Sequence, residues 1–125
     1  MDPIRLRIAD PRPAFSDRIP GDMWRWPPGD IPGRMCWWIV LPPNHPDCGT
    51  PGHPGELSWR TTQRASDGQF WQVAGTAPLL TVTPSIDVVR YVPNPDFRLG
   101  NGQPSHIRQG SYWHGYITDG YLVTV

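Results

Sequence analysis

The sequence contains no lysine and carries no net charge. Its 11 basic side chains are all arginine, and 11 acidic side chains balance them, so the formal charge at pH 7 is zero. A chain without net charge has no long-range field that would attract a phosphate backbone or an anionic lipid surface. We therefore expect no nucleic-acid partner and no membrane partner.

Long apolar runs are also absent from the sequence. No stretch approaches the roughly 20 apolar residues that a membrane-spanning helix needs, and the first ten residues lack the apolar core of a secretory signal. The expected location is therefore inside a cell or in a particle made inside a cell. Cysteine is scarce as well, because Cys36 and Cys48 are too few for a disulfide framework; they could pair, bind a metal or remain reduced.

Proline, glycine and tryptophan are abundant instead. With 17 prolines and 13 glycines among 125 residues, the composition approaches that of disordered chains. Seven tryptophans argue against disorder, because indole rings need a core or a partner to cover them. The length fits one domain. Arginine and tryptophan together are typical of surfaces that bind other proteins.

Residues 1–34 predict an extended arm. A helix longer than a few residues cannot form there because of seven prolines, at positions 3, 11, 13, 20, 27, 28 and 32. Ile4, Leu6 and Ile8 alternate with arginines, which is the period of a strand with one buried face. We expect this arm to lie mostly on another subunit and to bind it by adding a strand to an exposed sheet edge.

Residues 35–125 predict a β-domain, because no apolar period of 3.6 residues persists for three turns. Seven short apolar or alternating runs are separated by turn residues, at 35–41, 56–62, 69–74, 79–83, 86–92, 112–118 and 121–125. The expected fold is all-β, a small antiparallel sandwich or partly open barrel that carries the extended, proline-rich N-terminal arm.

Two dipeptides, Asp67-Gly68 and Asp119-Gly120, are hairpin signals, since a type I′ turn needs positive φ at both central residues. The second signal is the stronger because β-type residues adjoin it on both sides. Two segments rich in Pro, Gly and Asn are expected to be long loops, 42–55 and 93–110. Loops of this length in a compact domain tend to be functional or bound to a partner.

Four stretches of the β-domain form a recognisable series, CWWIVLPPNHPDCG, LSWRTTQRASDGQFWQV, VTPSI and WHGYITDG. The series resembles a family of small phage and bacterial proteins, the domain of unknown function 6527, whose phage members have often been labelled "ammonia monooxygenase". The family pattern is an aromatic strand entering a Cys/Gly segment, a Trp-bearing hairpin, a Pro-Ser strand and a His-containing strand that closes on Asp-Gly. The resemblance covers roughly residues 35–123 and leaves the arm out. It implies a phage-type protein of unassigned biochemistry and names no substrate.

A metal site is one reading of the cysteines. Two thiols and two imidazoles, the ligand types of tetrahedral zinc, fall in one window as Cys36, His45, Cys48 and His53. The spacing C-x8-H-x2-C-x4-H matches no standard zinc module, and Cys36 sits in a run that reads as core. Many members of the resembling family carry a compact Cys pair where this chain has prolines and Cys48-Gly49. We therefore expect no structural zinc and no other cofactor.

A hydrolase is a second reading, because Ser85, His114 and Asp119 fall in the family-like stretches. Such a set needs the serine hydroxyl within reach of the imidazole and a carboxylate that fixes the imidazole tautomer. The position of Asp119 is equally explained by its turn, and Ser85 lacks the Gly-x-Ser-x-Gly setting of a nucleophile elbow.

A recognition surface is the reading that we favour. Trp24 and Trp26 repeat the alternation of a strand and could anchor the arm in a neighbour's pockets or cap it onto its own body. The other candidate partner-binding residues are Ile4, Leu6, Ile8, Arg12, Arg18 and Arg25 in the arm, together with Tyr91 in the run 86–92 and Phe97 in the second loop. The sequence thus favours a non-enzymatic accessory protein of a phage particle, decorating the capsid or binding other virion proteins or copies of itself. Its location would be the virion, assembled in the host cytoplasm.

Overall fold

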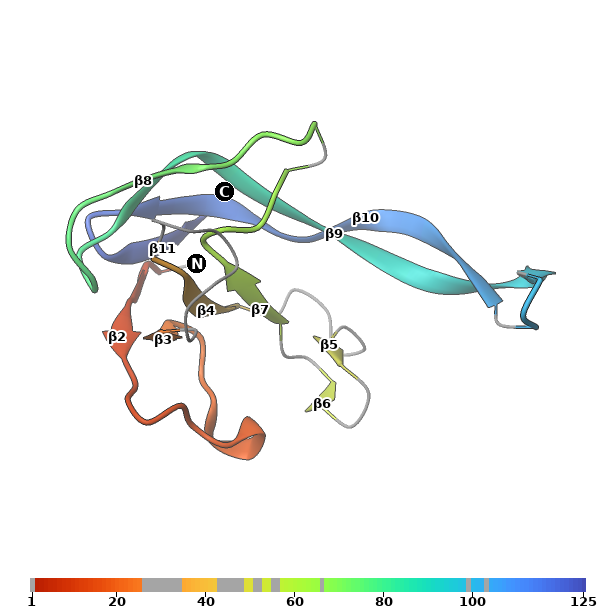
Figure 1. The fold of residues 1–125 in the computed structure, drawn as a ribbon, viewed down its shortest axis with the longest axis horizontal. Coiled ribbons are helices and arrows are strands. Elements are labelled where there is room, and N and C mark those ends of the chain that lie inside the picture. The colour runs from red at the N-terminus through yellow and green to blue at the C-terminus, as the bar shows by residue number, and fades with distance from the viewer. Residues whose placement is uncertain are drawn as a thin grey trace.

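The chain folds into two β-sheets that pack as an open sandwich (Figure 1). The computed structural model describes residues 2–25, 35–42, 49–50, 53–54, 57–65, 67–98, 100–102 and 104–125. These residues form strands and one short 3-10 helix, η1 (Phe15–Asp17), and they include no α-helix. The predicted all-β class is confirmed, and the sheets are sandwich-like rather than closed into a barrel. None of the described segments is a helix long and apolar enough to cross a membrane.

The first sheet has five strands, in the spatial order β1 (Ile4–Arg5), β11 (Tyr121–Thr124), β10 (Pro104–Thr118), β9 (Thr81–Arg98), β8 (Gln72–Ala74). The second has four, in the order β2 (Arg7–Ile8), β3 (Asp22–Arg25), β4 (Trp37–Leu41), β7 (Leu57–Arg60). All neighbouring strands are antiparallel except β2 and β3, which are parallel. A separate small pair consists of β5 (Gly49–Thr50) and β6 (His53–Pro54).

The inner faces of both sheets supply one core. Its fully buried members include Met23, Ile39, Leu41 and Trp59 from the second sheet and Val82, Ile86, Trp113, Ile117 and Leu122 from the first. Trp59 meets Trp71 edge to face with ring centroids 5.4 Å apart, which joins the second sheet to the segment that leads into β8. The Trp113 indole donates a hydrogen bond to Thr124 Oγ1 at 3.0 Å and covers Gly115, where a Cβ would collide with the ring.

The described part of the arm, residues 2–25, packs on this body, contrary to the expectation that the arm lies mostly on another subunit. Leu6 and Trp24 are only 2% and 4% exposed, and β1 adds to the edge of β11 through Ile4 opposite Leu122. The Leu6 amide donates to the Gly120 carbonyl at 2.8 Å. The alternation predicted one strand with one buried face, but the arm forms two short strands in different sheets, β1 at the edge of the first sheet and β2 beside β3, and Ile8 is 43% exposed. A tethered segment reaches such an edge at a lower entropic cost than a separate subunit does.

A buried carboxylate, that of Asp22, joins two segments of the arm. Asp22 is 1% exposed, and its Oδ1 accepts a hydrogen bond from the Arg7 guanidinium at 2.7 Å. Its Oδ2 accepts a hydrogen bond from the Ile19 amide at 3.2 Å. Because a buried charge needs both a counter-ion and hydrogen bonds, this pairing fixes β2 beside β3.

The hairpin at Asp119-Gly120 is confirmed. Asp119 and Gly120 have φ of 48° and 83°, and Thr118 pairs with Tyr121 across the turn. Asp67-Gly68 also forms a turn, in which the Gly68 amide donates to the Ala65 carbonyl at 2.9 Å. The flanking strands then separate, because β7 belongs to the second sheet and β8 to the first.

The prediction of a long loop at 93–110 is wrong. β9 and β10 run through this segment as paired strands, with His106 opposite Pro93 and Ile107 opposite Val92. Proline is tolerated here because it lies in a two-stranded ribbon whose outer edges need no hydrogen-bond partner in the sheet. The runs expected at 79–83 and 86–92 are likewise parts of one strand, β9. Of the other expected loop, 42–55, the described residues include the short pair β5–β6.

Replacing Gly120 with valine should destabilise the protein by more than the same change at Gly68. Both residues have φ of 83°, so both substitutions carry the strain of a β-branched side chain at positive φ, about 1–2 kcal/mol. Only at Gly120 would a Cβ also meet neighbours, the Pro78 carbonyl oxygen at 3.0 Å and Leu79 Cδ2 at 3.1 Å. Urea denaturation of the two variants measures the difference, and equal stabilities would contradict the turn geometry.

Replacing Leu6 with alanine should cost about 2–5 kcal/mol of unfolding free energy, since the side chain fills the core. The matched control is Ile8→Ala in the same arm, where the side chain is 43% exposed and the loss should stay near 0.5 kcal/mol. Chemical denaturation followed by tryptophan fluorescence measures both. Equal small losses would mean that the arm detaches from the body in solution.

Candidate functional site

The most prominent feature of the molecule is a two-stranded ribbon formed by the outer parts of β9 and β10 (Figure 1). The neighbouring strands stop early: β8 pairs with β9 only at residues 81–83, and β11 pairs with β10 only at 115–118. Beyond these points the two strands pair only with each other among the described residues. At about 3.3 Å per residue, the part from Val89 to Arg98 extends roughly 30 Å.

The two edges of this ribbon differ chemically. On β9, Pro93 and Pro95 lack backbone N–H groups, so this edge is poorly suited to accept another strand. On β10, residues 105–113 contain no proline, keep every backbone donor and pair with β9 alone among the described strands. An unpaired strand of this kind is a template for pairing with another chain.

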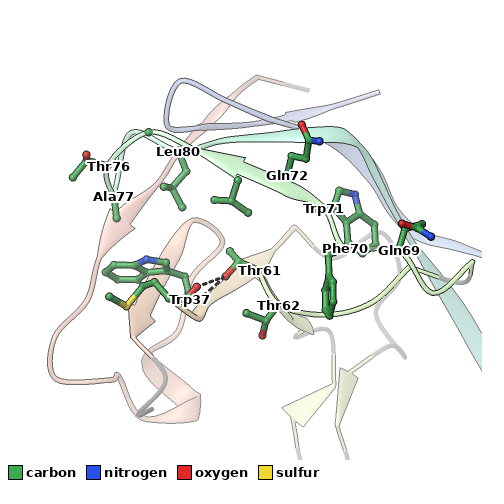
Figure 2. A pocket seen from close by; sticks show the side chains of 13 residues that line it. Trp37, Thr61, Thr62, Gln69, Phe70, Trp71, Gln72, Thr76, Ala77 and Leu80 are labelled. Carbon is green, nitrogen blue, oxygen red and sulfur yellow. Dashed lines mark hydrogen bonds between the residues drawn. The ribbon is translucent and has the colours of Figure 1, made fainter. Parts of the chain in front are cut away.

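A cleft of about 800 Å³ opens between the two sheets (Figure 2). Trp37 and Thr61 lie on the side of the second sheet, and Leu80 and Ala77 lie on the side of the first. The described lining contains no charged side chain; its remaining members are Met35, Thr62, Gln69, Phe70, Trp71, Gln72, Val73, Gly75 and Thr76. The cleft therefore suits a neutral occupant.

Two threonine hydroxyls of the cleft wall are engaged within the protein. Thr61 Oγ1 accepts a hydrogen bond from the Trp37 amide at 2.9 Å and donates to the Met35 carbonyl at 3.4 Å, as Figure 2 shows. Thr62 donates its hydroxyl to Cys36 Sγ at 3.3 Å. These two hydroxyls therefore serve the wall itself, and the cleft presents an uncharged surface of mixed polar and apolar character.

The structure brings two residues of the predicted hydrolase set together. Ser85 Oγ lies 3.4 Å from His114 Nε2, and both side chains are half-buried. They come from β9 and β10 near the base of the ribbon. A hydroxyl beside an imidazole nitrogen is the first contact that nucleophilic catalysis by serine requires.

Asp119 does not complete this set. Asp119 Oδ1 accepts a hydrogen bond from the Thr81 hydroxyl at 3.4 Å, and the Asp119 backbone amide donates to Thr81 Oγ1 at 3.0 Å. Asp119 therefore belongs to the hairpin turn. The acidic residue opposite His114 in the strand register is Asp87. Asp119 stands close to His114 in the chain, whereas Asp87 becomes its neighbour only through strand pairing.

Of the predicted metal set, only Cys36 has a described side chain. It is buried, and its sulfur accepts the hydrogen bond from Thr62, which fits a core thiol. His45 and Cys48 lie outside the described residues, and His53 is described through its backbone alone. Within the described part of the chain no three His, Cys, Asp or Glu side chains are gathered as metal ligands.

The predicted partner-binding residues of the arm divide into two groups. Leu6 and Trp24 belong to the core, and Ile4 packs against it, so these three are not free to bind a partner. Arg18 stacks over the Trp24 ring at 4.6 Å and donates to the Pro13 carbonyl at 3.1 Å.

Ile8, Arg12 and Arg25 are exposed and remain open to a partner, while Trp26 lies outside the described residues. Tyr91 and Phe97 both lie in the ribbon strand β9; a strand was expected at Tyr91 and a loop at Phe97. The ribbon itself was missed, although Asn101-Gly102 is a hairpin signal of the same type as Asp119-Gly120. Gly102 indeed has φ of 83°.

Comparison with known proteins found no match: no family model, no curated protein and no solved structure matches this chain.

Proposed function

We propose that this protein is a non-enzymatic accessory component of a phage particle and binds other virion proteins, or copies of itself, through the β9–β10 ribbon. The observation that carries the proposal is the ribbon, which extends beyond the body with an unpaired, proline-free edge on β10. The phage assignment is motivated by the sequence resemblance described above. The protein would then reside in the virion after assembly in the host cytoplasm.

The ribbon suits binding because its base is held by the core. Ile86 on β9 and Trp113 on β10 are fully buried, so both strands are anchored before they leave the body. An anchored ribbon loses less conformational entropy on binding than a free loop does. Its backbone edge can pair with a partner strand whatever the partner's sequence, and side chains along it then select the partner.

A variant with a shortened ribbon tests the proposal. Val89 and Ser111 are opposite each other, so replacing residues 90–110 with Asn-Gly leaves a two-residue hairpin between them. The variant should keep the melting transition of the body but be depleted at least tenfold from purified particles. Mass spectrometry of the particles measures its copy number beside that of the unaltered protein.

The matched control for the shortened ribbon is Asn101→Asp, which keeps an Asp-Gly turn and the full ribbon length. It should enter particles at the normal level. The proposal fails if the unaltered chain is absent from particles, or if the shortened variant enters them as well as the control does.

The contact between Ser85 and His114 supports a second candidate function, hydrolysis of an activated ester. In this candidate His114 takes the proton from Ser85 Oγ as the oxygen attacks a carbonyl, and Asp87 stabilises the resulting imidazolium from the neighbouring strand. The proton returns to the leaving group, and water then releases the acyl group from Ser85.

The hydrolytic candidate predicts that Ser85→Ala lowers the turnover of p-nitrophenyl acetate at least a hundredfold. Asp87→Asn should lower it also, whereas Asp119→Asn should not, because Asp119 serves the turn. Absorbance of released p-nitrophenolate measures the rates. Equal turnover by all four proteins, the unaltered chain included, would exclude this function.

A further inference from the structure

The sandwich is open along one side. β8 is the last strand of the five-stranded sheet, and β7 is the last strand of the four-stranded sheet. Residues 61–71 connect these two strands, and several of them line the cleft between the sheets. This side of the protein therefore combines a free sheet edge with an uncharged cleft.

The free edge is that of β8. Its residues Gln72, Val73 and Ala74 pair with β9 on one side, and no described strand pairs with them on the other. All three side chains are exposed. Val73, 40% exposed, lines the cleft with Leu80 and Trp37, whereas Ala74 does not line it.

An added strand would satisfy both parts of this surface. Its backbone could pair with the edge of β8, and every second side chain would then point toward the cleft. Because the described lining is uncharged, a charged side chain could enter only by losing its hydration without gaining a partner. The occupant should therefore be an extended segment with an uncharged residue, such as an aliphatic one, at the central position.

The ribbon of the same chain has these properties. Its β10 edge, residues 105–111, reads SHIRQGS, with Ile107 as the apolar residue and no proline to interrupt the backbone donors. The β9 edge contains Pro93 and Pro95 and is unsuitable. The ribbon extends away from β8 of its own chain (Figure 1), so it cannot fill its own cleft.

We propose that the cleft and the β8 edge accept the β10 edge of the ribbon from a second copy of this chain. Each copy then offers a ribbon at one place and an acceptor at another. Such an interface is heterologous, and it joins copies head to tail into a ring or an array. The inference rests on the proposed function in that it identifies the partner of the ribbon as another copy of the protein.

Two kinds of variant separate the donor from the acceptor. Val73→Lys places a charge at the mouth of the uncharged cleft and leaves the ribbon intact. Met35→Lys places a charge at the opposite wall, just before β4, where Met35 is 53% exposed. The shortened-ribbon variant keeps the acceptor and lacks the donor. Ala74→Lys is the matched control, with the same charge on the same strand but outside the cleft.

Sedimentation velocity on each purified protein measures the assembly. The unaltered chain and Ala74→Lys should form species larger than the 14.1 kDa monomer, and the other variants alone should stay monomeric or associate at least tenfold more weakly. An equimolar mixture of Val73→Lys with the shortened-ribbon variant should give a dimer and nothing larger, because only one donor and one acceptor remain. Circular dichroism checks that each variant is folded, and Met35→Lys replaces Val73→Lys if the latter is not.

The inference is overturned if the unaltered chain stays monomeric, if both lysine variants of the cleft assemble normally, or if the mixture gives no dimer. These outcomes are distinct from failure of the proposed function. A monomeric chain whose ribbon is still needed for entry into particles has another virion protein as its partner. A chain that assembles as described but is absent from particles retains the interface and loses the virion role.

Discussion

The pairing of β9 with β10 is the interaction on which the rest of the structure depends. These two strands are the third and fourth of the five-stranded sheet, and their inner residues Ile86, Trp113 and Ile117 form much of the core. The same strands continue outward as the ribbon. The direction of the ribbon is therefore set by the packing of the core, and a change in the core could alter it without touching a ribbon residue.

The fold class and one hairpin could be predicted from the sequence because they depend on local signals. Short alternating runs indicate strands, and Asp119-Gly120 indicates a turn whatever surrounds it. The location of the arm could not be predicted in this way. The pattern of Ile4, Leu6 and Ile8 shows that a strand edge receives it, but the same pattern would serve a neighbour's edge or the edge of β11.

For the candidate sites too, local sequence signals supply the residues, and the tertiary structure supplies their contacts. The closeness of Ser85 and His114 arises from strand register, so the sequence supplied the two residues and the pairing of β9 with β10 supplied their contact. The sequence did not predict the ribbon because Pro, Gly and Asn in 93–110 favour a loop. Prolines at the edge of a sheet are nevertheless compatible with a strand. The cleft depends on β7 and β8 ending their respective sheets, which no local signal in either strand records.

The tryptophan pairs have a consequence for how the protein can be observed. Trp24 and Trp38 lie stacked within the second sheet, with ring centroids 6.5 Å apart and planes 3° from parallel, whereas Trp59 and Trp71 meet at 89° between that sheet and the segment leading into β8. Indole transitions at such distances couple, and the coupled circular dichroism depends on how the two rings lie relative to each other. The Trp59–Trp71 pair joins two parts of the fold, whereas the Trp24–Trp38 pair lies within one sheet. The coupled signal of Trp59 and Trp71 should therefore change when the segment leading into β8 moves relative to the second sheet.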